Sequence, residues 1–300
     1  MRFFLSLISA VTVLHQTSAL TPVGHTPSGK PMYVVPNKSR IQQVGRDLKV
    51  FAPNGTVIET FANVFPQRTG KRNPATLTRR QGLSNVAAFV PLNNTNAMDM
   101  LEAFNTTFTV PPSPTTFESQ LLWFAASVVL PDENGVPMGE LRTLLQYGAT
   151  VIQGGPFWTI AAQFEWFPDA GGLLQGSPIG FDPNVDVGTA INTSIARIEE
   201  DFDPSLFWYE AGFYDDSDAF PQLELGVTEP AITAVIGMEE EGALQSSDYP
   251  PEPFRFTQTD LTLGGGFPEI EWDVESDPSA GAYVTVDVDG SKDAEIAIRF

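Results

Sequence analysis

The sequence predicts an all-β protein built as a sandwich of antiparallel strands. Clusters of turn-forming residues recur at short intervals from residue 81 onward, and the segments between them are short and rich in Phe, Val, Thr and Trp. The C-terminal end alternates strictly between apolar and polar residues. With 42% hydrophobic residues and 22 Phe, the chain of 300 residues has enough apolar side chains for a large core.

Five turn clusters, each rich in Gly, Pro, Asn or Asp, divide the second part of the chain into strands. They lie at 111–114, 131–135, 154–156, 169–172 and 264–266. After the last cluster, Val284, Val286 and Val288 alternate with polar residues, which predicts a half-buried strand. The Asp-Gly pair at 289–290 then favours a turn into a final hairpin strand that contains Ile296 and Ile298.

The N-terminus has the three-part layout of a cleaved secretory signal over residues 1–19. Met1 and Arg2 precede an apolar run at 3–14, and the small residues at 17–19 provide a cleavage site. We therefore predict a secreted, extracellular protein. Because no later run approaches the roughly 18 to 20 apolar residues of a membrane helix, we expect no membrane association after signal removal.

The charge of the chain changes sign near residue 80. Residues 1–80 hold 11 basic and 2 acidic residues, whereas residues 81–300 hold 5 basic and 35 acidic residues, a net charge of −30. The step coincides with two dibasic pairs, at 71–72 and at Arg79-Arg80, in a stretch rich in turn formers. These features predict a basic prosegment at 20–80, processing after Arg80, and an acidic sandwich domain at 81–300.

A basic segment ahead of an acidic domain binds it at neutral pH and is released as carboxylates protonate near their reference pKa of about 4. Such a segment would inhibit the domain until acid releases it. The alternative is that residues 20–80 are a spacer without an inhibitory role. The charge of −30 argues against nucleic acid and anionic membranes as partners, since both require positive charge at the contact. Among five Asn-x-Ser/Thr sequons, those at Asn93, Asn105 and Asn192 lie in the predicted domain and are candidate glycosylation sites.

The residue inventory limits the chemistry to carboxylates. The chain has no Cys, and its two histidines, His15 and His25, precede the predicted domain. This excludes cysteine nucleophiles, Ser-His-Asp triads and His-metal sites from the domain. We expect no cofactor and no metal, because the acidic runs at 199–203, 214–216 and 239–241 lack the spacing of a calcium loop. Paired-carboxylate glycosidases and acid peptidases remain.

Six segments resemble, in order, motifs of the fungal glutamic peptidases, the eqolisins. They lie at 84–87, 108–111, 122–125, 145–148, 164–169 and 253–254, and the most specific are Leu-Gln-Tyr-Gly at 145–148 and Glu-Trp-Phe-Pro at 165–168. The resemblance implies a concanavalin-like β-sandwich, a prosegment, and peptide or protein substrates cut at acid pH. It covers most of residues 84–256.

The resemblance also implies roles for individual residues. The Gln amide that orients water and stabilises the oxyanion falls on Gln146. The Glu that acts as general base falls on Glu229 under one register, whereas a second register places Val235 there and removes the base. Glu165 is a third option, and with Trp123 and Trp166 it is a candidate for substrate binding.

Two hypotheses follow from these assignments. The first is a secreted glutamic-type acid endopeptidase, and the second is a non-catalytic sandwich of the same ancestry that binds peptide or glycan. Val86 and Ser127 replace a tryptophan and an aspartate of the family pattern, which favours the second. The feature that separates them is the distance from the Gln146 amide to the nearest carboxylate. We expect a monomer in either case.

Overall fold

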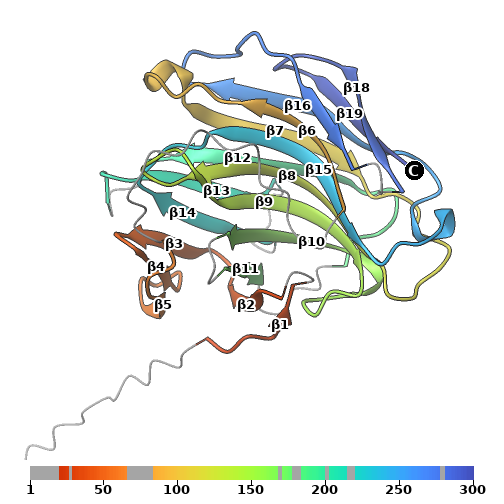
Figure 1. Cartoon of the computed structure of the whole chain (residues 1–300), viewed down its shortest axis with the longest axis horizontal. Coiled ribbons are helices and arrows are strands. Elements are labelled where there is room, and N and C mark those ends of the chain that lie inside the picture. Colours follow the sequence, from red (N-terminus) through yellow and green to blue (C-terminus); the bar gives the residue numbers. More distant parts are fainter. Residues whose placement is uncertain are drawn as a thin grey trace, which may run out of the picture.

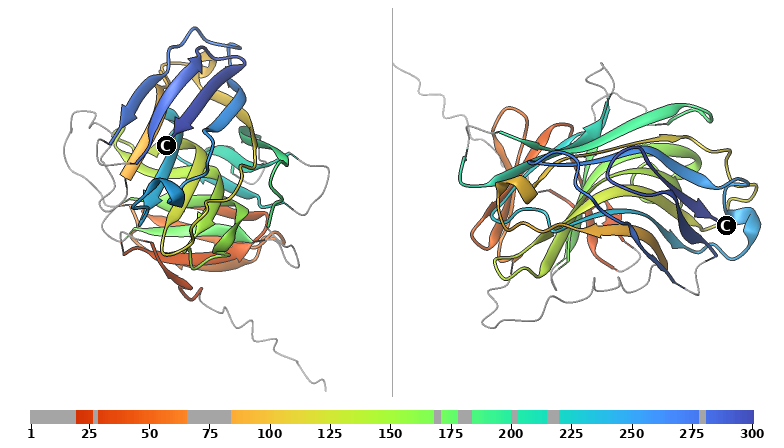
Figure 2. Two further views of the ribbon diagram at one scale, coloured as in Figure 1. Left: turned by 90° about the vertical axis from the view of Figure 1, so that its right-hand side faces the viewer. Right: turned by 90° about the horizontal axis from the view of Figure 1, so that it is seen from above.

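The computed structural model describes residues 20–26, 29–65, 84–167, 171–177, 184–199, 203–214, 220–277 and 281–300. These residues form two large β-sheets, of nine and ten strands, together with two short 3₁₀ helices, η1 (Ala97–Asp99) and η2 (Ser246–Asp248). Figures 1 and 2 show the two sheets layered against each other. The predicted all-β sandwich is confirmed.

The nine-stranded sheet has the order β1-β2-β11-β10-β9-β8-β15-β6-β17. Its strands are β1 (Gly24–His25), β2 (Pro31–Pro36), β6 (Ser84–Pro91), β8 (Leu121–Pro131), β9 (Pro137–Gly148), β10 (Gly155–Trp166), β11 (Gly172–Ser177), β15 (Thr233–Glu241) and β17 (Asp273–Ser276). The long central strands β8, β9 and β10 pair antiparallel, and turns at 132–136 and 149–154 connect them. Asp132 forms one of these turns, where its Oδ1 accepts from the amides of Asn134 and Val136 at 2.8 and 2.9 Å.

The ten-stranded sheet has the order β18-β19-β16-β7-β12-β13-β14-β3-β4-β5. Its strands are β3 (Ser39–Val44), β4 (Asp47–Phe51), β5 (Val57–Phe61), β7 (Leu101–Thr109), β12 (Ala190–Ile198), β13 (Phe207–Phe213), β14 (Leu223–Val227), β16 (Phe254–Leu263), β18 (Tyr283–Val288) and β19 (Ala294–Arg299). It covers one face of the nine-stranded sheet, and the main core lies between the two.

The strands of residues 20–65 extend both sheets at the same edge of the sandwich. Strand β2 pairs parallel with β11, and β3 pairs parallel with β14, so this segment crosses from one sheet to the other. Figure 1 shows β1–β5 together along the lower edge. Ile41, Leu48 and Val50 are completely buried in the main core. Residues on both sides of the charge step near residue 80 thus contribute strands to the same two sheets, and the division of the chain at residue 80 and cleavage there stay predictions.

The final hairpin forms as the alternating pattern predicts. Strands β18 and β19 pair antiparallel, and Ile296 and Ile298 are buried. Val284 is also buried, but Val288 is 45% exposed because the register shifts between Val286 and Val288. The extra residue of such a bulge interrupts the alternation that the sequence alone predicts.

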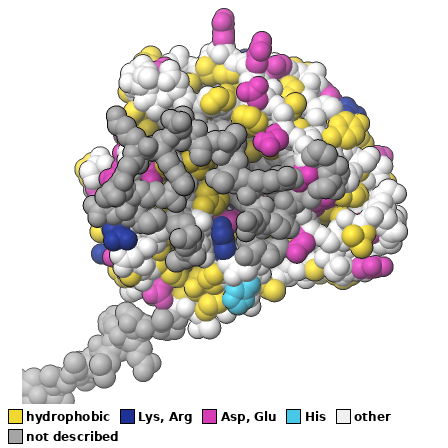
Figure 3. Space-filling view, in the orientation of Figure 1, with side chains coloured by type: hydrophobic (Ala, Val, Ile, Leu, Met, Phe, Trp, Pro, Cys, Tyr) yellow, Lys and Arg dark blue, Asp and Glu magenta, His cyan; other side chains and the backbone are white. Residues whose placement is uncertain are grey.

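The described part of the chain contains no helix that is both long and apolar enough to span a membrane. Figure 3 shows many acidic and few basic side chains on the face in view.

Candidate functional site

The site predicted around Gln146 lies on the outer face of the nine-stranded sheet, the face turned away from the ten-stranded sheet. Neighbouring side chains of β9 point to opposite faces, so Leu145 and Tyr147 pack in the main core while Leu144 and Gln146 face outward. A second, separate apolar cluster covers part of the outer face. Its members are Met32, Leu121, Trp123, Leu144, Ile152, Ala161 and Leu173.

Gln146 is fixed by the turn that follows β9. Its Nε2 donates to the backbone carbonyl of Ile152 at 2.9 Å, and the side chain is 1% exposed. Gly148 makes this turn possible, because its φ is +108° and a Cβ there would lie 1.9 Å from the carbonyl oxygen of Gln120. The glycine of the Leu-Gln-Tyr-Gly motif thus allows the backbone to bend around the glutamine.

Gln146 and Trp123 place an acceptor beside a donor. The two residues are direct partners on β9 and β8. Among the described residues, Gln146 Oε1 and Trp123 Nε1 are both buried without a hydrogen-bond partner. Trp158 Nε1 and Thr143 Oγ1 in the core are unpartnered too, so this property alone does not define a site. The outer-face pair differs in chemistry, because it combines an acceptor and a donor on directly paired residues of neighbouring strands.

Glu239 is the carboxylate that the sheet places in line with this pair. On β15 it is the direct partner of Trp123, which is itself paired with Gln146. Two strand spacings put the Cα atoms of Glu239 and Gln146 about 10 Å apart, with Trp123 between them. The sequence drew attention to Glu239 only as part of the acidic run at 239–241. The strand register is what reveals it.

Arg142 connects the carboxylates of the outer face. It is 0% exposed, and its Nη1 lies 3.0 Å from Glu239 Oε1 while its Nη2 lies 3.3 Å from Glu165 Oε2. Its Nε donates to Gln163 Oε1 at 2.8 Å, and its guanidinium carbon lies 4.8 Å from the ring centre of Trp123. Such a multiply bonded arginine holds both carboxylates in place and favours their ionised form.

A row of amides continues the polar network toward β11. Gln163 Nε2 donates to Gln175 Oε1 at 2.7 Å, and Gln175 Nε2 donates to Gln153 Oε1 at 3.4 Å. Both Gln163 and Gln175 are 0% exposed. Burial of this many amides contributes little net stability, since each exchanges hydrogen bonds with water for hydrogen bonds with its neighbours.

Glu165 lies on the outer face, as expected of a substrate-binding residue, but not next to Gln146. The direct partner of Gln146 on β10 is Thr159. Glu165 lies six residues further along this strand, a separation of about 20 Å. Its Oε1 forms an ion pair with Lys30 Nζ at 3.1 Å. The structure therefore does not support Glu165 as the base that acts with Gln146.

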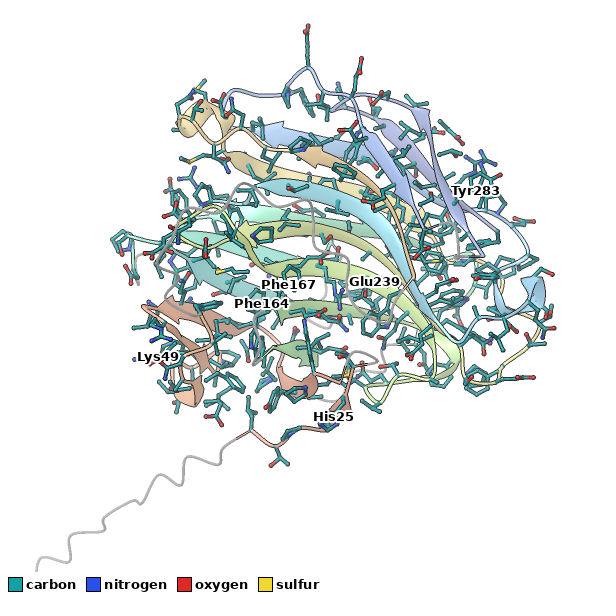
Figure 4. All side chains as sticks on the ribbon, viewed as in Figure 1. His25, Lys49, Phe164, Phe167, Glu239 and Tyr283 are labelled. Atoms are coloured by element: carbon teal, nitrogen blue, oxygen red, sulfur yellow. The ribbon has the colours of Figure 1, made fainter. Side chains whose placement is uncertain are left out.

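Trp166 does not share the outer face with Glu165. Adjacent residues of a strand point to opposite faces, so Trp166 packs in the main core, where its ring lies 5.2 Å from Phe61 and 6.2 Å from Phe164. The prediction that Trp166 contacts the substrate is therefore corrected, because its side chain lies in the core between the two sheets. Figure 4 labels Phe164, next to Trp166 in this cluster, and Glu239 on the outer face.

Glu229 is also separated from Gln146. It lies in the loop before β15, and Thr233, where that strand begins, is already six residues or about 20 Å from Glu239. Burial raises the pKa of Glu229, and the negative charges of Glu133 and Asp132 in the β8–β9 turn raise it further. Glu229 therefore belongs to the opposite end of the sheet, and the Gln146–Glu229 pair does not form.

Val235 is not in line with Gln146 either, because it lies four residues along β15 from Glu239. It faces outward in line with Ser127 and Arg142, and it provides no group that could take a proton. Asn93 and Asn192 are exposed, and Asn105 is half-buried and accepts from Ser194 Oγ at 2.7 Å. Arg79 and Arg80 lie outside the described residues, as do residues 1–19. Glycosylation and processing stay predictions.

The described residues contain no group of three His, Asp or Glu side chains arranged to hold a metal ion.

No family model and no curated protein matches this chain. Among solved structures, it is similar to scytalido-glutamic peptidase with a peptide-based transition-state analogue, at 10% identity and a TM-score of 0.42, covering 72% of this chain and 98% of that one. A second structure of that peptidase, with a transition-state analogue inhibitor, matches at 12% identity and the same TM-score and coverage. A third is SCP-B, a member of the eqolisin family in complex with the tripeptide Ala-Ile-His, at 10% identity, a TM-score of 0.41 and the same coverage.

Proposed function

We propose that the chain is a secreted acid peptidase of the glutamic type whose catalytic pair is Gln146 and Glu239. The observation that supports this most directly is the row Glu239, Trp123 and Gln146 on three paired strands of one face. It combines an acid with an unpartnered amide oxygen and an unpartnered indole N–H. The motif resemblance of the sequence around Gln146 points to the same chemistry.

The proposed mechanism uses the groups in their observed surroundings. Glu239 takes a proton from a water held between it and Gln146, and the water oxygen attacks the peptide carbonyl carbon to form a tetrahedral oxyanion. The protonated Glu239 then donates its proton to the amide nitrogen as the C–N bond breaks, which releases the amine and the carboxylic acid and restores the Glu239 carboxylate. Gln146 Oε1 accepts a hydrogen bond from that water. The second N–H of its Nε2, which is not needed by Ile152, stabilises the oxyanion, and Trp123 Nε1 donates to the substrate. Arg142 keeps Glu239 ionised in acid, where a base must remain deprotonated.

A second function, peptide binding without hydrolysis, is favoured by the same arginine. The ion pair between Arg142 and Glu239 makes the carboxylate a weaker base and occupies one of its oxygens. Val235 also removes the base that the family register would supply at that position. In this reading, the donor and acceptor at Trp123 and Gln146 hold a peptide amide that is never cut.

Hydrolysis of a denatured protein substrate between pH 2 and 6 tests the proposal. We expect activity that peaks well below pH 6, a fall in kcat of about 10² to 10³ in Gln146→Ala, the usual loss for one oxyanion donor, and no turnover in Glu239→Gln. Glu229→Gln is the matched control, since it makes the same chemical change at the other end of β15 and should leave turnover unchanged.

Two results would contradict the assignment. Full activity of Glu239→Gln would remove Glu239 as the base, and absence of cleavage by the unmodified protein would leave the binding function. In the latter case, a peptide should still bind, and Gln146→Ala should weaken its affinity. Far-UV circular dichroism of each variant checks that the sandwich is intact.

A further inference from the structure

Lys30 lies on the outer face, where its ammonium group contacts three kinds of partner. Its Nζ lies 3.1 Å from Glu165 Oε1 and 3.5 Å from the backbone carbonyl oxygen of Trp166, and it stands 5.3 Å from the ring centre of Phe167. A carboxylate, a carbonyl and an aromatic face together suit a primary ammonium. Figure 4 labels Phe167. We call these groups, with Gly171, the ammonium pocket.

Gly171 makes room for the aliphatic part of the lysine. A Cβ at this position would lie 2.8 Å from Lys30 Cε and 2.8 Å from the carbonyl oxygen of Trp166. Any side chain at residue 171 would therefore displace the lysine stem or the carbonyl that receives it. The pocket fits an unbranched chain that ends in a charged nitrogen.

The carboxylate of Glu165 is held between two positive charges. Glu165 is 3% exposed, and its Oε2 lies 3.3 Å from Arg142 Nη2 while its Oε1 lies 3.1 Å from Lys30 Nζ. Its direct partner on β9 is Glu140, which brings a second carboxylate to the same face. A buried carboxylate is stabilised by a cation at hydrogen-bond distance, and Lys30 supplies one here.

The chain that delivers Lys30 lies on the sheet as an extended strand. Residues 31–36 form β2, which pairs with the edge of β11. Alternation places Met32 and Val34 on the same side as Lys30, and both pack with the second apolar cluster on the outer face. An extended segment with a lysine followed by apolar residues at every second position therefore fits this surface, as in recognition by strand addition.

We propose that the ammonium pocket is a subsite for the lysine side chain of an extended peptide, and that Lys30 is its occupant within the chain itself. This inference rests on the proposed function in one respect, namely that the external ligand is a peptide. It assigns Glu165 to recognition of a lysine side chain rather than to chemistry at Gln146. Phe167 and the Trp166 carbonyl position the ammonium, and Gly171 admits the stem.

Chemical rescue of Lys30→Ala in the full chain tests the pocket. The side-chain atoms that this substitution removes correspond to an n-propylammonium ion. Added n-propylammonium should therefore bind in their place and raise the melting temperature of the variant saturably, by about 1 to 4 °C. Neutral n-propanol should not have this effect. The double variant Lys30→Ala/Glu165→Gln should not respond to the ion. Lys49→Ala, which removes a lysine from β4 in the other sheet, is the matched control (Figure 4).

Equal responses of Lys30→Ala, the double variant and Lys49→Ala would overturn the proposal. If Lys30→Ala does not fold, reductive methylation of the unmodified protein gives an independent answer. Lys30 should react several-fold more slowly than Lys49, and Glu165→Gln should increase the Lys30 rate. Equal rates for the two lysines would overturn the pocket.

A separate readout distinguishes this inference from the proposed function. If the protein hydrolyses peptides once processed, a substrate with lysine at the position that reaches Glu165 should be preferred about 10-fold in kcat/KM over one with norleucine. Rescue by n-propylammonium without any hydrolysis supports the pocket and contradicts the peptidase. Hydrolysis without rescue and without a lysine preference supports the peptidase and overturns the pocket.

Discussion

The two faces of the nine-stranded sheet bury side chains of different character. The inner face packs Phe124, Leu145 and Trp158 against the ten-stranded sheet in one continuous apolar core. The outer face buries Arg142, Gln146 and other charged or amide side chains almost as completely. Both faces come from the same strands, and they differ only in which alternate residues point to them.

The difference predicts that the two faces contribute unequally to stability. Apolar burial contributes about 25 cal/mol for each Å² removed from water, so the inner face can hold the sandwich together. Buried charges and amides return little net stability after desolvation. The outer face should therefore add less to the stability of the sandwich than the inner face, and three substitutions test this contrast.

The largest effect is expected in the core. Phe124→Ala removes a ring that stacks on Phe254 at 4.2 Å and lies 5.8 Å from Trp158, and it should lower the free energy of unfolding by about 3 to 5 kcal/mol. Urea unfolding measures the change. Leu244→Ala is the control, because Leu244 is 87% exposed and its truncation should cost less than about 0.5 kcal/mol. A small loss in Phe124→Ala would mean that the inner face does not stabilise the sandwich.

The outer face should respond in a way that depends on pH. Arg142→Met leaves Glu165 and Glu239 without the guanidinium they share and should cost about 3 kcal/mol at pH 7. At pH 3 the cost should shrink, because the abandoned carboxylates can protonate. Arg255→Met, at an exposed pair with Asp287, should cost less than about 1 kcal/mol at either pH. A pH-independent loss in Arg142→Met would show that the arginine acts by packing alone.

The smallest effect concerns an acid on the inner side of β15. Glu240 is buried, accepts hydrogen bonds from Tyr249 Oη and from the amide of Gly281, and burial raises its pKa despite these bonds. The folded state therefore holds the proton more tightly than the unfolded state. That stabilising contribution is present below about pH 4.3 and is lost as the pH rises through the raised pKa.

Glu240→Gln removes this titration. Relative to the unmodified protein, the variant should gain stability between pH 3 and pH 7, as measured by urea midpoints. Glu252→Gln, which makes the same chemical change at an exposed loop position, is the control. A stability difference between Glu240→Gln and the unmodified protein that stays constant from pH 3 to pH 7 would contradict the raised pKa of Glu240.

Pairing partners were harder to predict than strands. The strands around Gln146 follow from local patterns of apolar residues and turns, and so does the final hairpin of β18 and β19. The position of Glu239 beside Trp123 does not, because register is set by contacts between strands that are more than 100 residues apart in the chain. The sequence therefore indicated Gln146 and Trp123, but it offered Glu229 and Glu165 as acids that the register separates from them.

The sequence by itself determined the all-β class, the core-forming strands and the restriction to carboxylate chemistry, because these depend on composition and local alternation. Only the tertiary structure decided that residues 20–65 complete both sheets and that Lys30 meets Glu165. The charge step at residue 80 suggested a separable segment, since net charge is a property of composition. Burial of Ile41, Leu48 and Val50 in the common core depends instead on where the chain returns in space.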